Sequence, residues 1–292
     1  MKFKGSFTAL ITPLKNGEVD EKAFQDFVDW QIKEGTNGLV PCGTTGESPT
    51  LTHEEHKRVT EICIEVAKGR AVVMAGAGSN STAEAIELAI HAEKAGADAL
   101  LVVTPYYNKP TQEGLFRHYE AINNAVSTPI FIYNIPGRSV VDMSMETMAR
   151  LAKLANISGV KDATSDLARP IQVAKIIGHD FAQLSGEDAT AIPFLAAGGH
   201  GCISVTSNIA PRLCAEQHNA WADGDIDKAM EIQERLIPVH SAMFCESSPG
   251  PVKHAAEILG LCSSELRLPL CEISDASKKT VEDALRQAGI TN

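Results

Sequence analysis

The sequence lacks the features that mark several common classes of protein. Its seven cysteines include no Cys-x-x-Cys pair, so neither a zinc ribbon nor a thioredoxin-like redox site is indicated. No run of about 18 apolar residues occurs, which argues against a membrane-spanning helix. No apolar stretch of signal-peptide length follows Lys2 and Lys4. We therefore expect a cytoplasmic protein with reduced, mostly buried thiols and no metal site.

Positive charge is also scarce. The chain has 26 Lys and Arg residues against 37 Asp and Glu residues, for a formal net charge of -11 at pH 7. A surface of this sign disfavours nucleic acids and anionic membranes as partners, although it allows a local basic pocket. What is present is 292 residues, 44% of them hydrophobic, which is enough for two ordinary domains or one large α/β barrel.

Apolar, β-rich runs alternate with amphipathic helical patterns along the chain. The runs show little polar–apolar alternation, as expected for parallel strands covered on both faces. Such units predict an α/β fold closed as a (β/α)8 TIM barrel. An open doubly wound sheet is the alternative, weakened because no GxGxxG or GxxxxGK[ST] motif follows any run. The eight runs are Ser6–Ile11, Gly38–Pro41, Ala71–Ala75, Ala99–Val103, Pro129–Tyr133, Ile157–Val160, Phe181–Leu184 and Gly201–Val205.

Helical patterns fill the intervals and the C-terminal end. Glu21–Lys33 and Thr82–Lys94 each carry an apolar stripe, and sequences resembling capping boxes begin at Thr52 and Ser81. We expect residues 1–222 to form the barrel domain and residues 223–292 to form an additional helical layer packed on it. That layer could cap the barrel or mediate assembly. Helices are expected at about Pro211–Ala222, Asp225–Met243, Val252–Leu259 and Asp275–Ala288.

Lys161 directly follows the buried run Ile157–Val160. An ammonium group at the end of a buried strand is costly unless it is paired. Burial favours the neutral amine, which is the form that attacks a carbonyl to make a Schiff base. The alternative is a lysine that has just left the strand and extends to solvent.

A glycine- and threonine-rich segment at another strand end could bind a substrate. Gly43–Glu47 offers free backbone donors and two threonine hydroxyls, which suit a carboxylate. It could instead be a polar turn in which Glu47 caps the next helix. Cys42, just before it, has no histidine nearby in the sequence and is expected to be structural.

Tyr133 ends the strand that precedes the Lys161 strand, so the two side chains should be neighbours. A phenol there can relay protons, or it can be a wall tyrosine with a satisfied hydroxyl. Arg138, a few residues later, can clamp a carboxylate through two hydrogen bonds, or it can simply face solvent.

Three motifs together resemble the pyruvate-dependent class I aldolase superfamily, which includes the N-acetylneuraminate lyase and dihydrodipicolinate synthase families. They are Gly43–Glu47, Tyr133–Arg138 and Gly159–Ala163. The resemblance to the synthase family is the closer one and runs over essentially the whole chain. Further motifs that carry it are Thr104–Asn108, Leu184–Asp188 and Gly199–Val205.

The resemblance implies a lyase-type enzyme that condenses pyruvate with L-aspartate 4-semialdehyde in the biosynthesis of lysine and diaminopimelate. Lys161 would form the Schiff base with pyruvate. Thr44, Tyr133 and Tyr107 would relay protons, with Tyr107 reaching in from a neighbouring subunit. No metal or cofactor would be required, because the imine itself stabilises the carbanion.

The same resemblance implies the residues that hold the substrates. Thr45 would help to bind the pyruvate carboxylate, and Arg138 would hold the carboxylate of the aldehyde. Gly186 and Ile203 would line the pocket through their backbone.

Assembly and regulation are also implied by the resemblance. Family members are often homotetramers, built as dimers of dimers, and many are inhibited by L-lysine at a cleft between subunits. Glu84 would pair with the ammonium group of the ligand. Pro49 departs from the alanine of some lysine-sensitive members. The matching positions are Ser48, His53, His56, Asn80, Glu84 and Tyr106.

Two alternatives to the synthase remain open on the sequence. One is a retro-aldol lyase of a sugar acid, which has less use for the cation of Arg138. The other is a non-catalytic barrel that binds a small carboxylate, a reading that Lys161 and Tyr133 weigh against.

Overall fold

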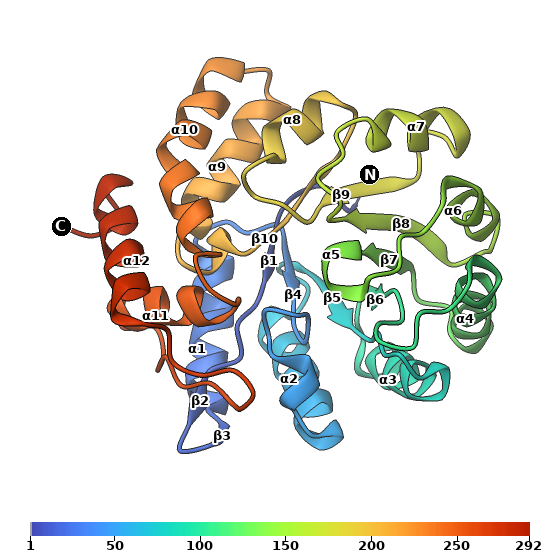
Figure 1. Ribbon diagram of the computed structural model, residues 1–292, viewed down its shortest axis with the longest axis horizontal. Helices are drawn as coiled ribbons and strands as arrows, with labels where there is room; N and C mark the ends of the chain where they lie inside the picture. The colour runs from blue at the N-terminus through green and yellow to red at the C-terminus, as the bar shows by residue number, and fades with distance from the viewer. Residues whose placement is uncertain (1) are drawn as a thin grey trace. The chain divides into compact units, whose positions relative to one another are not determined.

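The computed structural model describes residues 2–292, so residue 1 of the predicted barrel domain lies outside the described residues. Eight parallel strands pair in the order β1-β10-β9-β8-β7-β6-β5-β4 and close as a barrel. At least one helix separates each strand from the next (Figure 1). The predicted α/β barrel is therefore confirmed. The strands are β1 Gly5–Ala9, β4 Gly38–Val40, β5 Val72–Gly76, β6 Ala99–Val103, β7 Ile130–Asn134, β8 Ile157–Asp162, β9 Ala182–Ser185 and β10 Gly201–Ser204.

A short hairpin that the sequence analysis did not predict follows β1. Strands β2, Leu14–Lys15, and β3, Glu18–Val19, pair antiparallel. Asn16 and Gly17 between them both have positive φ, as a two-residue primed turn requires. Strands of two residues are too short to show alternation, so only the Asn-Gly pair could have indicated the hairpin.

The helices follow the predicted pattern closely. Thr52 caps its helix with a complete capping box, and the Ser81 hydroxyl accepts a hydrogen bond from the Glu84 amide. Within residues 2–292, every helix is too short or too polar to cross a lipid bilayer. The helices are α1 Glu21–Lys33, η1 Ser48–Thr50, α2 His53–Ala67, α3 Thr82–Ala95, α4 Gln112–Ala125, α5 Pro136–Ser139, α6 Met145–Leu151, α7 Arg169–Ile176, α8 Ala191–Ala196, η2 Thr206–Asn208, α9 Pro211–Ala222, α10 Ile226–Ala242, α11 Gly250–Ile258 and α12 Asp275–Gln287.

The chain forms two compact units. Among the described residues, the first contains Val73–Ile203 and residues 2–4. Its core lies between strands β6 and β7 and the helices α3, α4 and α6, where Leu100, Tyr119 and Ile132 are fully buried. The second contains Gly5–Val72 and Ser204–Asn292, so the C-terminal helices α10–α12 fold with β1, β4, α1 and α2. Within it α10 packs on α9 and α12, and α11 packs on α12.

Strand β8 is longer than predicted. The predicted strand ends at Val160, whereas β8 continues through Lys161 to Asp162. Asn134 of β7 pairs with Asp162, and so does Ser185 of β9. The strand can continue because the Asp162 carboxylate meets the Arg169 guanidinium at 2.8 Å, which offsets the cost of burying a charge. Lys161 therefore lies within the sheet.

Candidate active site

Lys161 is a buried lysine without a counter-ion. Its side chain is in the buried class, with the residue 6% exposed. The nearest aromatic ring is that of Tyr133, whose centre lies 4.1 Å from the Lys161 Nζ, in the geometry of a cation–π contact. Among the described residues 2–292, no carboxylate forms an ion pair with this amine. The alternative of a lysine extended into solvent is therefore wrong, and the amine is held beside Tyr133 as predicted.

The register of the sheet explains this arrangement. Tyr133 of β7 pairs with Lys161 of β8, and Lys161 pairs in turn with Leu184 of β9. Gly186 then leaves room for the lysine, because a Cβ at that position would lie 3.2 Å from the Lys161 Cε and 2.7 Å from the Ala163 Cβ. Ile203, the remaining predicted pocket residue of this unit, lies buried in β10.

The Tyr133 hydroxyl differs from that of a wall tyrosine. The residue is 6% exposed, yet its hydroxyl has no hydrogen-bond partner within the part of the chain that the structure describes. A wall tyrosine would have satisfied its hydroxyl within the protein. The contrast is Tyr119, whose hydroxyl donates to the Val102 carbonyl at 2.7 Å.

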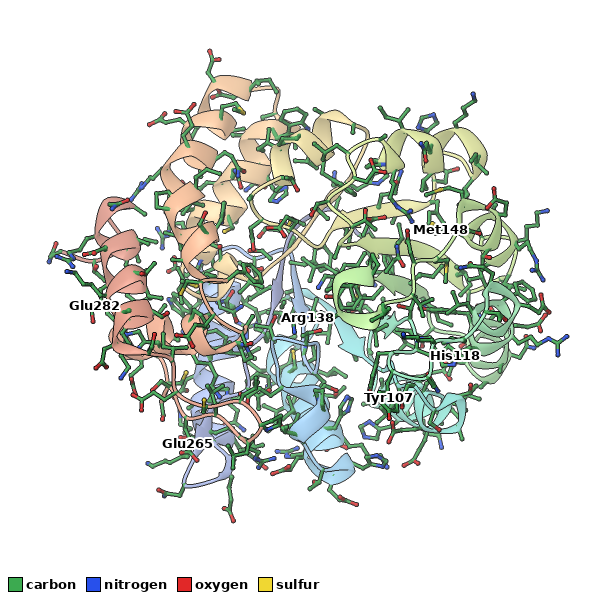
Figure 2. All side chains as sticks on the ribbon, in the orientation of Figure 1. Tyr107, His118, Arg138, Met148, Glu265 and Glu282 are labelled. Carbon is green, nitrogen blue, oxygen red and sulfur yellow. The ribbon has the colours of Figure 1, made fainter. Side chains whose placement is uncertain are left out.

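Arg138 lies on the short helix α5 that follows β7 (Figure 2). Its side chain is exposed and forms no ion pair with any of residues 2–292. The helix itself is anchored by Ser139, whose hydroxyl accepts from the Thr104 hydroxyl and donates to the Ile135 carbonyl. A fixed backbone with an unpaired guanidinium suits capture of a carboxylate from solution.

A polar network that the sequence analysis missed holds the ends of β7 and β8. The Asp162 carboxylate accepts hydrogen bonds from the Thr164 hydroxyl at 2.6 Å and from the Arg169 Nε at 2.8 Å. The Asn134 side chain bridges the Asp142 carboxylate and the Met143 amide. The only signal in the sequence was the Lys-Asp pair itself, in which a carboxylate directly follows a lysine at the end of a buried run.

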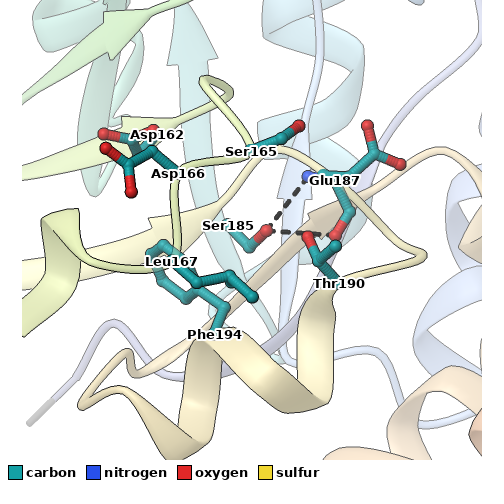
Figure 3. A pocket seen from close by; sticks show the side chains of 8 residues that line it. All are labelled: Asp162, Ser165, Asp166, Leu167, Ser185, Glu187, Thr190 and Phe194. Carbon is teal, nitrogen blue, oxygen red and sulfur yellow. Dashed lines mark hydrogen bonds between the residues drawn. The ribbon is translucent and has the colours of Figure 1, made fainter.

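A narrow pocket adjoins this network (Figure 3). The Ser185 hydroxyl there accepts a hydrogen bond from the Glu187 amide and donates to the Glu187 carbonyl. Burial, together with the negative charge of Asp188, raises the pKa of the Glu187 carboxyl. The pocket is lined by Asp162, Ser165, Asp166, Leu167, Ser185, Glu187, Thr190 and Phe194.

The segment Gly43–Glu47 belongs to the second unit and follows β4. The amides of Gly46 and Glu47 donate to the carbonyls of Gly43 and Thr44, so these donors are used within the turn. The amides and hydroxyls of Thr44 and Thr45 have no partner among residues 2–292. Two of the expected free donors are thus present, together with both hydroxyls. Glu47 occupies the N-cap position of η1 without a capping bond, and its carboxylate instead pairs with Lys253 at 2.6 Å.

The residues expected at the lysine cleft are divided between the two units. In the first unit, Glu84 accepts from the Ser79 hydroxyl, and burial together with the Glu84 charge raises the pKa of Tyr106. The Asn108 side chain donates to the Asn80 carbonyl. In the second unit, Ser48 begins η1, and His53 and His56 lie on the first turn of α2.

Tyr107 differs from the other predicted catalytic residues. It lies on the loop after β6 (Figure 2), is 89% exposed and has a φ of 70°. Within this chain, therefore, its side chain is not buried beside Lys161.

All seven cysteines are free thiols, and Cys42, Cys63, Cys202 and Cys214 are buried. Burial raises the pKa of Cys42 to about 12, so this thiol is unreactive at neutral pH, as expected for a structural residue. Groups of three or more His, Cys, Asp or Glu side chains suited to a metal ion are absent from residues 2–292.

Comparisons with known proteins place this chain in a family. The dihydrodipicolinate synthetase family matches residues 2–288. The chain is 61% identical to a 4-hydroxy-tetrahydrodipicolinate synthase of Bradyrhizobium diazoefficiens, over 100% of this chain and 98% of the relative. A crystal structure of an Acinetobacter baumannii dihydrodipicolinate synthase complexed with pyruvate superposes with a TM-score of 0.96 at 45% identity, covering 99% of each chain. A lysine-bound synthase of Cyanidioschyzon merolae superposes with a TM-score of 0.96 at 36% identity, again over 99% of each chain. The chain belongs to the dihydrodipicolinate synthetase family.

Proposed function

We propose that this member of the family acts as a 4-hydroxy-tetrahydrodipicolinate synthase, a Schiff-base-forming enzyme that condenses pyruvate with L-aspartate 4-semialdehyde. The observation that carries the proposal is Lys161, which is buried, without a counter-ion and 4.1 Å from the Tyr133 ring centre. Relatives about 60% identical over the whole chain bear the synthase name. That agreement favours the synthase over a sugar-acid lyase or a non-catalytic barrel.

Lys161 supplies the covalent chemistry. Its amine attacks the pyruvate ketone, water leaves and an imine forms. The imine accepts the electron pair when a proton leaves the pyruvate methyl group, and the resulting enamine carbon attacks the aldehyde. The amino group of the bound aldehyde then displaces Lys161 from the imine carbon, which closes the ring and frees the enzyme.

Proton transfers in these steps are assigned to Tyr133, Thr44 and Tyr107. The unpartnered hydroxyl of Tyr133, on the ring that lies beside the amine, supports its part in this relay. The free hydroxyl of Thr44 can extend the relay. The exposure of Tyr107 fits a residue that completes the site of a second copy of the chain.

Each of the two substrate carboxylates is assigned to its own group of hydrogen-bond donors. The free amides of Thr44 and Thr45 and the Thr45 hydroxyl suit the pyruvate carboxylate. The unpaired guanidinium of Arg138 suits the carboxylate of the aldehyde. Gly186 and Ile203 would line the pocket through their main chain.

Regulation and assembly are proposed in line with the family. L-lysine would bind where Glu84 can receive its ammonium group, with polar contacts from Ser48, His53, His56, Asn80 and Tyr106. A homotetramer, built as a dimer of dimers, would place Tyr107 in a neighbouring site. Residues 223–292 would form the added helical layer. The cytoplasm is the expected compartment, since four buried thiols fit a reducing environment.

The direct test measures pyruvate consumption with L-aspartate 4-semialdehyde as the acceptor, with and without L-lysine. We expect turnover that depends on both substrates and falls as lysine is added. Turnover that is unaffected by L-lysine would contradict the proposed regulatory site but support the synthase. Pro49 would then be the first residue to examine. Imine formation without turnover on this aldehyde would contradict the synthase assignment.

A further inference from the structure

Lys253 is a second buried lysine, far from Lys161 in the sequence. It lies on α11 between Val252 and Ala255, on the helix face that is buried, and it is 0% exposed. Its Nζ donates to the Glu47 carboxylate at 2.6 Å and to the Thr12 carbonyl at 3.0 Å. Replacing a buried ion pair with apolar residues often stabilises a protein. Stability alone therefore does not explain why Lys253 and Glu47 form a fully buried ion pair.

The partner of Lys253 ends the loop that carries Thr44 and Thr45. This loop is bounded by Cys42 at φ 55° and Glu47 at φ 57°, two non-glycine residues in the sparsely populated left-handed region. Each is held by its side chain. The Cys42 thiol donates to the His56 carbonyl at 3.4 Å, and Glu47 is held by Lys253.

Thr12 ties the same loop to the same lysine. Its hydroxyl donates to the Gly46 carbonyl at 2.8 Å, while its own carbonyl accepts from Lys253. Gly46 fits tightly there, because a Cβ would lie 3.0 Å from the Leu10 carbonyl oxygen. The second Glu47 oxygen accepts from the Arg267 amide at 3.3 Å. Gly46 and Glu47, the last two residues of the loop, are thus fixed by several hydrogen bonds. The positive charge that pairs with Glu47 comes from Lys253 in the C-terminal segment.

We propose that Lys253 is a positioning residue for pyruvate: through Glu47 and Thr12 it sets the conformation in which Thr44 and Thr45 present their free donors. The proposal rests on the proposed function, since it assigns those donors to the pyruvate carboxylate. It gives α11 of the C-terminal helices a part in substrate binding, although Lys253 itself touches no substrate.

The test uses a neutral version of the pair. Lys253→Met alone leaves the Glu47 charge buried and can prevent folding, so the informative variant is Glu47→Gln with Lys253→Met. Arg235→Met is the matched control, because it removes another C-terminal cation whose Nε donates to the Ala288 carbonyl, away from the loop. For each protein, the adduct trapped by borohydride is measured against pyruvate concentration, without aldehyde. The half-saturating aldehyde concentration is then measured at saturating pyruvate.

For the neutral pair we expect the half-saturating pyruvate concentration to rise about tenfold or more, as for the loss of one well-placed hydrogen bond to a charged group. The half-saturating aldehyde concentration should stay within about twofold of the wild-type value. The Arg235→Met control should match the wild type for both substrates. A folded double variant with a wild-type pyruvate curve would overturn the proposal, as would equal losses for both substrates. A wild type that traps no pyruvate would instead overturn the proposed function beneath it.

Discussion

Lys161 and Lys253, both buried, differ in what surrounds them. Lys253 is 0% exposed and donates to a carboxylate and a carbonyl, whereas Lys161 is 6% exposed and lies against a tyrosine ring without a carboxylate partner. Both are in buried elements, so burial alone does not mark the reactive amine. An ammonium fixed by hydrogen bonds has no lone pair to offer, while an amine without a counter-ion can become a nucleophile. We therefore propose that the absence of a paired carboxylate, rather than the depth of burial, marks Lys161 as the catalytic lysine.

The largest effect is expected from the unpaired lysine. Lys161→Ala removes the nucleophile, so turnover should fall by about a thousandfold or more. Steady-state rates of pyruvate consumption measure this loss. Lys175→Ala, at an exposed position on α7, is the control and should retain wild-type rates. A Lys161→Ala enzyme that kept a tenth of the activity would show that another group carries the chemistry.

The paired lysine should act mainly on stability. Lys253→Met leaves the Glu47 carboxylate buried and unpaired, which should lower the free energy of unfolding by about 3–5 kcal/mol. Adding Glu47→Gln should recover most of that loss, because no charge then remains buried. Denaturant titrations of the two variants measure both changes. If the single variant were as stable as the double variant, the Glu47 charge would have found another partner.

Among residues 2–292, His118 is another buried base without a counter-ion, as Lys161 is. Burial lowers its pKa from 6.5 to about 4, and its Nε2 has no partner among the described residues. The pKa in the folded state is below the value in the unfolded state. The stability that neutral His118 contributes is therefore complete above pH 6.5 and is lost as the pH falls from 6.5 to 4.

The difference between the two pKa values corresponds to about 3 kcal/mol of stability, which is lost between pH 6.5 and pH 4. His118→Gln should consequently lose less stability than the wild type between pH 6.5 and pH 4. The exposed His179→Gln should follow the wild type. Unfolding midpoints measured at several pH values test this, and parallel curves for His118→Gln and the wild type would contradict it.

Arg138 gives the smallest of these effects and the one most specific to a substrate. Arg138→Ala should lower kcat/KM for the aldehyde by about 10- to 100-fold, the value of a charge-assisted hydrogen bond or two. Formation of the pyruvate imine should be nearly unchanged. Kinetics with each substrate varied in turn separate the two. Equal losses would mean that Arg138 holds the α5 segment rather than a substrate.

The sequence predicted the elements well and the contacts between distant elements poorly. Continuous apolar runs identified all eight barrel strands, since parallel strands covered on both faces have that composition. The sequence also predicted correctly that Lys161 and Tyr133 are neighbours, because the ends of adjacent strands meet in a barrel. The Asp162–Arg169 contact, however, depended on β8 running two residues beyond its apolar run. Nothing in the periodicity indicated that charged residues would continue a buried strand.

The Glu47–Lys253 pair shows the same limit more sharply. Its members are separated by 206 residues, and no helical or strand pattern relates residues so far apart. Lys253 did leave one local signal, a single cation on the apolar face of a helix. A buried cation requires a partner, but only the folded chain identifies Glu47 as that partner. The sequence could assign a carboxylate site to the threonine loop without revealing what holds the loop in place.

Locating the covalent intermediate tests most directly whether Lys161 forms the Schiff base with pyruvate. The wild-type protein is incubated with pyruvate, reduced with borohydride and digested, and the modified peptide is identified by mass spectrometry. We predict one adduct, on the peptide that contains Lys161, and none on the peptide that contains Lys253. An adduct on Lys253 or on any exposed lysine, with Lys161 unmodified, would contradict the account.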